Sequence, residues 1–274
     1  MVERFRASDG YEFAYRRYKA VGEPKAHLVF VHGIRSHGGW YERSCNELAA
    51  KGFEVSFLDR RGAGLNEKDR GDCPSFRRLL DDLNEFIERE SNGLPVISAG
   101  ISWGAKIVLG SAIRKPGHVS GIVLITPGIV PLVRVPFGQR LQIALSRFFS
   151  PRKLFPIPLN EAELFTASPN WRAFIEADLR GLRMATARFL FNSVQLDLYL
   201  RRGLSLVDPP VMLLSAGKDR IADRVKSKAV LESRMPRGRF QEIIYLNASH
   251  TLEFEEACPF AAQIADWCKF VVTR

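Results

Sequence analysis

Short, continuously apolar runs that alternate with helical patterns constrain this chain more than any other feature. Strands without polar and apolar alternation are buried on both faces, which is typical of a parallel sheet covered by crossover helices. The pattern therefore predicts an α/β fold with a mostly parallel central sheet and helices on both faces. The runs are HLVFVHG (27–33), FEVSFLD (53–59), LPVISAGIS (94–102), GIVLITP (121–127), PVMLLSAG (210–217) and QEIIYLN (241–247).

The segments that flank these runs fit the same fold. Residues 3–18 predict an antiparallel hairpin, because two alternating stretches surround the turn signal Ser8-Asp9-Gly10. A chain of 274 residues is long enough for one large α/β domain that carries an insertion. Helical patterns cover residues 41–52, 75–90, 104–115, 137–149, 185–202, 223–235 and 260–272.

One connection is far longer than the rest, because 80 residues (128–207) separate two consecutive strands. A crossover in such a sheet needs only about a dozen residues including its helix. We therefore predict a helical cap over residues 128–207, inserted between a first core segment (1–127) and a second (208–274). Ligands of such sheets bind at the carboxyl ends of the strands, so the cap would cover the site.

The composition of the cap allows two interpretations. It holds eleven Lys and Arg against five Asp and Glu, which is +6 of the chain's +10. Its phenylalanines either line an apolar acyl pocket beneath a basic rim that touches a membrane, or form the cap's own core. Nucleic-acid binding is not favoured, since it would rest on net charge alone and the basic residues are scattered. The phenylalanines are Phe137, Phe148, Phe149, Phe155, Phe165, Phe174, Phe189 and Phe191.

Composition also limits the cellular setting. No apolar run approaches the ~20 residues that span a bilayer, and the charged N-terminus leads into no secretory signal. Cys45, Cys73, Cys258 and Cys268 lack disulfide-framework or metal-motif spacing, so we expect reduced thiols. We expect a cytoplasmic enzyme; the sequence specifies no oligomeric state.

The stretch Gly100-Ile101-Ser102-Trp103-Gly104 lies where an apolar strand runs into a helix. This is the context of a nucleophile elbow, a sharp turn that exposes a serine and leaves little room for neighbouring side chains. Because a serine hydroxyl is a weak nucleophile, Ser102 needs a base within hydrogen-bond reach.

Elimination among the five histidines identifies candidate bases for Ser102. His27 and His118 precede their strands and would lie at the opposite edge of the sheet. His32 adjoins the turn at Gly33 and is expected to support that loop. His250 follows the last strand and is the favoured base, with His37 as the alternative.

A base of this kind needs a carboxylate that holds its tautomer. Asp219 falls just past the end of a strand and is the favoured acid. Asp223 is the nearest alternative but is expected to begin the next helix, and Asp59 is expected to form a structural salt bridge in the turn that holds Arg61 and Gly62. The chain order Ser, Asp, His is that of one known triad arrangement.

An acyl-transfer site also needs donors for the oxyanion. The backbone N–H of Trp103, at the start of the helix after Ser102, is one predicted donor. The N–H of Ile34, in the loop after the first long strand, is the other.

Several motifs in register carry a family resemblance over nearly the whole chain, weakest in the cap. FVHGIRSHGGWYE, FLDRRGAGLN, GISWG, LLSAGKDRIAD and NASHTLEFE resemble those of α/β-hydrolases of the monoacylglycerol lipase and lysophospholipase type. The resemblance implies Ser102, Asp219 and His250 as a catalytic triad and Ile34 and Trp103 as oxyanion donors.

The chain departs from the family's usual pattern at two places. Arg35 and Ser36 follow Ile34 where the family usually has a glycine and an acid. Trp103 is bulkier than the small residue or methionine often found after the nucleophile, which indicates a narrowed or aromatic-walled pocket.

The sequence therefore predicts a serine hydrolase that cleaves carboxylic esters through an acyl-enzyme, with no metal or organic cofactor. The resemblance implies monoacylglycerol- or lysophospholipid-like substrates. An acyltransferase or a C–C bond hydrolase could use the same triad. A catalytically silent protein that binds an apolar ligand is the alternative from another class.

Overall fold

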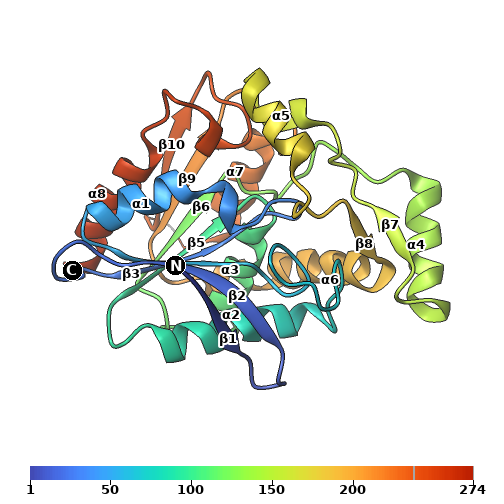
Figure 1. The fold of residues 1–274 in the computed structure, drawn as a ribbon, viewed down its shortest axis with the longest axis horizontal. Helices are drawn as coiled ribbons and strands as arrows, with labels where there is room; N and C mark the ends of the chain where they lie inside the picture. Colours follow the sequence, from blue (N-terminus) through green and yellow to red (C-terminus); the bar gives the residue numbers. More distant parts are fainter. Residues whose placement is uncertain (237, 274) are drawn as a thin grey trace.

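An eight-stranded sheet runs through the centre of the molecule (Figure 1). The structure is a computed structural model that describes residues 1–236 and 238–273. Strands β1, β2 and β4 pair antiparallel, and every other neighbouring pair is parallel, which confirms the predicted mostly parallel sheet. In spatial order the strands are β1 (Val2–Arg6), β2 (Glu12–Tyr18), β4 (Glu54–Leu58), β3 (His27–Val31), β5 (Val96–Ile101), β6 (Gly121–Ile125), β9 (Val211–Ala216) and β10 (Phe240–Tyr245).

The central strands are buried in the way that their continuous apolar sequences predict. Every residue of β3, β5, β6 and β9 is buried. The edge strands β1 and β10 mix exposed and partly buried positions, because no strand covers their outer side. The carboxyl ends of β3, β5, β6 and β9 therefore meet at one edge of a rigid, buried sheet.

Helices cover both faces of this sheet (Figure 1). On one face α1 packs against α8, and on the other α3 packs against α2 and α6. Nearly all of α3 is buried, since it lies between the sheet and two further helices. The helices outside the long connection are α1 (Glu42–Ala50), α2 (Phe76–Glu90), α3 (Gly104–Arg114), α7 (Arg224–Arg234) and α8 (Phe260–Val272).

The long connection between β6 and β9 is helical over the two predicted segments and holds further elements. α4 coincides with the predicted helix, whereas α5 and the antiparallel pair β7–β8 are absent from the sequence prediction. Strands of three residues are too short to give a periodic pattern. In chain order the elements are α4 (Phe137–Phe149), β7 (Leu154–Pro156), α5 (Pro169–Ala177), β8 (Met184–Thr186) and α6 (Ala187–Gly203). The division of the chain into core and cap at residues 128 and 207 stays a prediction.

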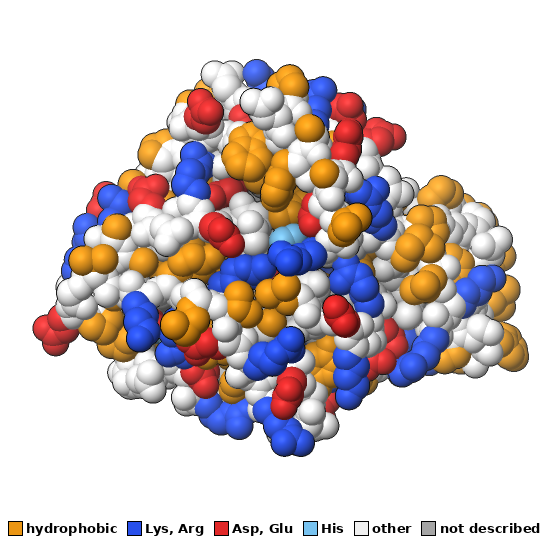
Figure 2. All heavy atoms as spheres, viewed as in Figure 1, with side chains coloured by type: hydrophobic (Ala, Val, Ile, Leu, Met, Phe, Trp, Pro, Cys, Tyr) orange, Lys and Arg blue, Asp and Glu red, His pale blue; other side chains and the backbone are white. Residues whose placement is uncertain are grey.

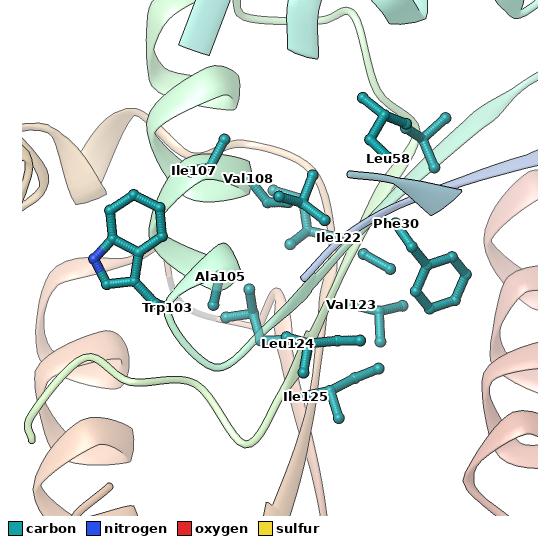
Figure 3. Close-up of a cluster of buried hydrophobic side chains, with 14 of the residues drawn as sticks. Phe30, Leu58, Trp103, Ala105, Ile107, Val108, Ile122, Val123, Leu124 and Ile125 are labelled. Atoms are coloured by element: carbon teal, nitrogen blue, oxygen red, sulfur yellow. The ribbon is translucent and has the colours of Figure 1, made fainter. Parts of the chain in front are cut away.

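The hydrophobic core beneath the site joins β3 and β6 to the first turns of α3 (Figure 3). Phe30, Val123 and Leu124 are buried there at 1% exposure or less. Trp103 projects from the start of α3 on the side away from Val123 and Leu124 (Figure 3). The indole ring therefore faces away from these sheet residues.

Two compositional expectations concern thiols and membrane spans. All four cysteines are free and buried. Across residues 1–236 and 238–273, no helix is long and apolar enough to span a bilayer.

Candidate active site

Ser102 lies on a strained turn between β5 and α3. Its φ of +52° is in the left-handed region, which is costly for a residue other than glycine. A Cβ added at Gly100 would lie 2.5 Å from Ala105 Cα, and one added at Gly104 would lie 2.4 Å from the carbonyl oxygen of Val31. The backbone approaches so closely at this turn that both flanking positions must be glycine.

Ser102, His250 and Asp219 form one chain of hydrogen bonds. His250 Nε2 lies 2.9 Å from Ser102 Oγ, and His250 Nδ1 lies 2.8 Å from Asp219 Oδ2. The second oxygen of Asp219 accepts the backbone N–H groups of Ile221 and Ala222 at 2.8 and 2.9 Å. The aspartate is thus held by its own loop, and its other oxygen fixes the proton of His250 on Nδ1, which leaves Nε2 free to accept the serine proton.

The alternative base, His37, lies in a different hydrogen-bond network. Its Nε2 lies 3.3 Å from Asp178 Oδ1, and its Nδ1 accepts the backbone N–H of Gly39. Trp40 Nε1 donates to Asp178 Oδ2. Burial raises the pKa of Asp178, but the bonds with His37 and Trp40 outweigh it and lower the pKa to about 2. His37 therefore connects the loop after β3 to the long connection, away from Ser102.

His32 supports its loop, as the sequence predicts. The backbone N–H of Arg60 donates to His32 Nε2 at 3.0 Å, and Nδ1 donates to the carbonyl of Gly33 at 2.8 Å. Burial lowers the pKa of His32 to about 3, so the ring stays neutral and keeps this pair of bonds. His27, the first residue of β3, bonds to Ser56 of β4, and His118, just before β6, bonds to Ser111 of α3. Both histidines therefore lie near the amino ends of their strands, as predicted.

The alternative acids have structural partners. The side chain of Asp223 caps α7 by accepting the backbone N–H of Lys226, as predicted. Asp59 forms a buried salt bridge, but its partner is Arg16 and not Arg61. The association with Arg61 expected from their proximity in sequence is wrong, because Arg61 pairs instead with Asp82 on α2.

The two predicted oxyanion donors lie beside Ser102. A Cβ added at Gly33 would be 3.2 Å from Ser102 Cβ, so the loop that carries Ile34 passes alongside the serine. Within the described residues, neither the N–H of Ile34 nor that of Trp103 donates a hydrogen bond. Both N–H groups are therefore available to a ligand oxygen.

Aromatic side chains from the long connection enclose the site. The ring of Phe165 meets His250 edge-on at 6.2 Å between centroids. The Trp103 ring packs against Phe189 at 5.2 Å, and its Nε1 donates to Ser193 Oγ at 2.8 Å. Phe165 and Phe189 are buried, whereas Phe137, Phe148 and Phe149 are among the most exposed apolar residues, a difference within the phenylalanines that the sequence does not predict.

Two buried arginines next to the site escaped sequence reasoning. Arg35 donates to the carbonyl of Leu159, and Arg60 donates to the carbonyl of Ile34. Burial lowers the pKa of both, that of Arg60 to about 10. An arginine in a polar loop gives no sequence signal of burial, because exposed arginines occur in the same context.

Metal ligands were not expected. In the part of the chain that the structure describes, no group of three or more His, Cys, Asp or Glu could hold a metal ion.

A serine on a strand-to-helix elbow of a mostly parallel sheet, bonded to a histidine and through it to an aspartate, defines an α/β-hydrolase of the serine type. Residues 22–257 match the family described as "Serine aminopeptidase, S33" (Hydrolase_4), and the chain belongs to this family. The family resemblance drawn from the sequence motifs is thereby confirmed.

Known proteins of this class are similar to the chain over most of its length. The human monoglyceride lipase is 26% identical over 260 residues, which are 90% of this chain and 82% of that protein. The monoacylglycerol lipase of Paleococcus ferrophilus superposes with a TM-score of 0.85 at 19% identity, over 95% of this chain and 100% of that one. A soluble variant of the Saccharomyces cerevisiae monoglyceride lipase, solved with a substrate analogue, superposes with a TM-score of 0.82 at 21% identity, over 99% and 94% of the two chains.

These comparisons confirm the α/β-hydrolase fold and the enzyme class, a carboxylic ester hydrolase. The particular ester and the roles of individual residues belong to the proposal that follows.

Proposed function

We propose that this enzyme hydrolyses carboxylic esters of single-chain lipids, monoacylglycerol- or lysophospholipid-like, with Ser102 as the nucleophile. The single observation that carries the proposal is the hydrogen-bond chain from Ser102 through His250 to Asp219, at 2.9 and 2.8 Å. The similarity to a human monoglyceride lipase supports the lipid substrate.

In the proposed first step His250 Nε2 accepts the proton of Ser102 as its Oγ attacks the ester carbonyl carbon. Asp219 stabilises the imidazolium, and the N–H groups of Ile34 and Trp103 hold the oxyanion. The C–O bond to the alcohol breaks, and His250 donates the proton to the departing alcohol oxygen. A water then gives its proton to His250, attacks the acyl-enzyme and releases the acid with Ser102 restored.

Ester hydrolysis by matched serine variants tests this proposal. Ser102→Ala should lower kcat on a monoacylglycerol, a lysophosphatidylcholine and a p-nitrophenyl ester by on the order of 10⁴-fold or more. Ser98, four residues earlier and on the buried strand β5, is the control, since its hydroxyl has no hydrogen-bond partner among the described residues and Ser98→Ala should keep full activity. Hydrolysis retained by Ser102→Ala would contradict the proposal.

The same site chemistry could transfer the acyl group to an alcohol or cleave a C–C bond. Product analysis with competing alcohol acceptors separates these outcomes, and the proposal predicts free acid as the main product. A folded protein that binds the lipid without turning it over would instead be a ligand-binding protein.

We further propose that α4 rests on an anionic lipid surface. Its apolar side chains recur at the spacing of one helical face and are 54–84% exposed. Figure 2 shows the hydrophobic side chains on the part of the molecule where Figure 1 places α4. Exposed Arg134, Arg140 and Lys153 lie beside this face in the chain, so anionic head groups complement it. The apolar side chains are Phe137, Leu141, Leu145, Phe148 and Phe149.

Vesicle sedimentation tests this surface. Phe148→Ser combined with Phe149→Ser should reduce binding to phosphatidylglycerol vesicles by at least about tenfold, because both rings are removed from the contact. Leu246→Ser is the matched control. Leu246 is also an exposed apolar residue, at 70%, but it follows β10 and lies outside the long connection that holds α4. Unchanged vesicle binding of the double variant would contradict the proposed surface.

A further inference from the structure

Arg60 bonds twice to the loop that carries Ile34. It lies just after β4 and is only 5% exposed. Its Nη2 donates to the carbonyl of Ile34 at 2.6 Å, and its backbone N–H donates to His32 Nε2 at 3.0 Å. One residue therefore fixes both ends of the short loop segment from His32 to Ile34.

The same guanidinium also reaches the other side of the site. It lies over the Trp103 ring at 5.2 Å from the ring centroid and over the Phe189 ring at 4.9 Å. Both distances are within the range of cation–π attraction. Arg60 thus contacts Ile34 and Trp103, the two residues whose backbone N–H groups are the proposed oxyanion donors.

The charge of Arg60 has no carboxylate partner. Among the described residues Arg60 forms no ion pair, and its Nε and Nη1 are buried without a hydrogen-bond partner. The neighbouring Asp59 is engaged by Arg16 and by the backbone N–H groups of Gly38 and Leu65.

A small cavity next to Arg60 does not supply a negative charge that would pair with its guanidinium. The cavity measures about 20 Å³, and its lining includes apolar side chains and Asp82. The Asp82 carboxylate is already paired with Arg61 and Arg78 and forms no ion pair with Arg60. A space of this size holds one water, which can accept a hydrogen bond but brings no negative charge. Since the pKa of Arg60 is about 10, the guanidinium is protonated at neutral pH.

A buried, unpaired cation opposes folding, so packing alone does not account for an arginine at this position. In the proposed reaction the ester carbonyl becomes an oxyanion between the N–H groups of Ile34 and Trp103, the two residues that Arg60 contacts. In a site that excludes water, a fixed positive charge stabilises such an anion without reorganisation at the moment of reaction.

We propose that Arg60 is a positioning residue for the oxyanion hole. Its guanidinium holds the Ile34 carbonyl and the Trp103 ring in place, and its unpaired charge favours the anion that forms between their N–H groups. The proposal rests on the esterase function above and names a residue that acts through the two donors without touching substrate.

Two substitutions test the role. Arg60→Met keeps the length of the side chain and removes its charge, so kcat should fall about 10- to 100-fold with KM unchanged. The thermal unfolding midpoint should stay the same or rise, because an unpaired buried charge is lost. Arg60→Lys keeps the charge without the planar fork and should recover part of kcat. Phosphonylation of Ser102 by a fluorophosphonate should slow in parallel with kcat.

Arg70→Met is the matched control. Arg70 also donates to backbone carbonyls, those of Gly64 and Arg180, but contacts neither Ile34 nor Trp103, so Arg70→Met should keep kcat within about twofold.

Three outcomes would overturn the positioning role. They are a kcat for Arg60→Met within threefold of wild type, a loss confined to KM, or a lower kcat that accompanies a lower unfolding midpoint. If Arg60→Met does not fold, Arg60→Lys decides, and a wild-type kcat for it overturns the proposal. A wild-type enzyme that neither hydrolyses esters nor reacts with the fluorophosphonate would contradict the proposed esterase function itself. That result differs from the three above, in which the wild-type enzyme is active.

Discussion

At the scale of single residues, Asp219 and Asp223 lie four positions apart and have different partners. Asp219 accepts a hydrogen bond from Nδ1–H of His250, whereas Asp223 caps α7. Asp219→Asn should lower kcat by on the order of 10⁴-fold, because the amide favours the wrong tautomer of His250. Steady-state kinetics on a p-nitrophenyl ester measures the loss.

Asp223→Asn is the matched control for this substitution. Asparagine caps a helix about as well as aspartate, so both activity and stability should stay close to wild type. Equal losses of kcat in the two variants would contradict the distinct roles of Asp219 and Asp223.

The sequence could predict those site residues that follow a strand. Ser102 and Asp219 follow the buried strands β5 and β9, and His250 follows the edge strand β10. The carboxyl ends of these parallel strands meet at one edge of the sheet, so the proximity of the three residues was predictable. Arg60 also follows a strand, but whether its side chain is buried depends on Trp103 and Phe189, which come from helices elsewhere in the chain. No local pattern specifies that contact.

At the scale of elements, the turn between β5 and α3 depends on Gly104. An added Cβ would meet the carbonyl oxygens of Val31 and His32 at 2.4 and 2.5 Å, and backbone cannot move aside as a side chain can. Gly104→Ala should lower the free energy of unfolding by about 3 kcal/mol or more. Urea denaturation measures this change.

Gly138 provides the opposite case within α4. A Cβ added there meets nothing within 4 Å, and alanine favours helix, so Gly138→Ala should raise the free energy of unfolding by up to about 1 kcal/mol. A Gly104→Ala protein as stable as Gly138→Ala would show that the turn is not sterically closed.

Elements with a strong sequence period were predictable, and those set by tertiary contacts were not. α4 and α8 follow the predicted ranges because their apolar residues recur at helical spacing. β7 and β8 are three residues each and lie far apart in the chain, so only their pairing makes them strands. The hydrogen bonds between His37 and the long connection depend on Asp178, 141 positions away, and were unpredictable for the same reason.

At the scale of the whole molecule, two buried histidines make stability depend on pH. Burial lowers the pKa of His27 to about 4 and that of His32 to about 3. Because the unfolded chain binds their protons near pH 6.5 and the folded protein does not, stability is complete above that pH. It should decrease as the pH falls toward 4, by up to about 1.4 kcal/mol per pH unit for each histidine.

Urea unfolding of wild type and His27→Gln from pH 8 to 4.5 checks this dependence. Glutamine can keep the hydrogen bond to Ser56 without titrating in this range, so the pH dependence should be shallower in the variant. Asp82 and Glu253 act in the opposite sense at acid pH, since burial raises the pKa of both. The difference between the two proteins is therefore the informative quantity, and identical pH profiles would contradict the assignment to His27.

The most direct test of the nucleophile is to react the folded protein with a fluorophosphonate and map the modified peptide by mass spectrometry. The hydrogen bond between Ser102 and His250 predicts one phosphonyl group per chain, on Ser102, and none on Ser102→Ala. Modification of another residue, or an unmodified Ser102 in a folded protein, would contradict the account.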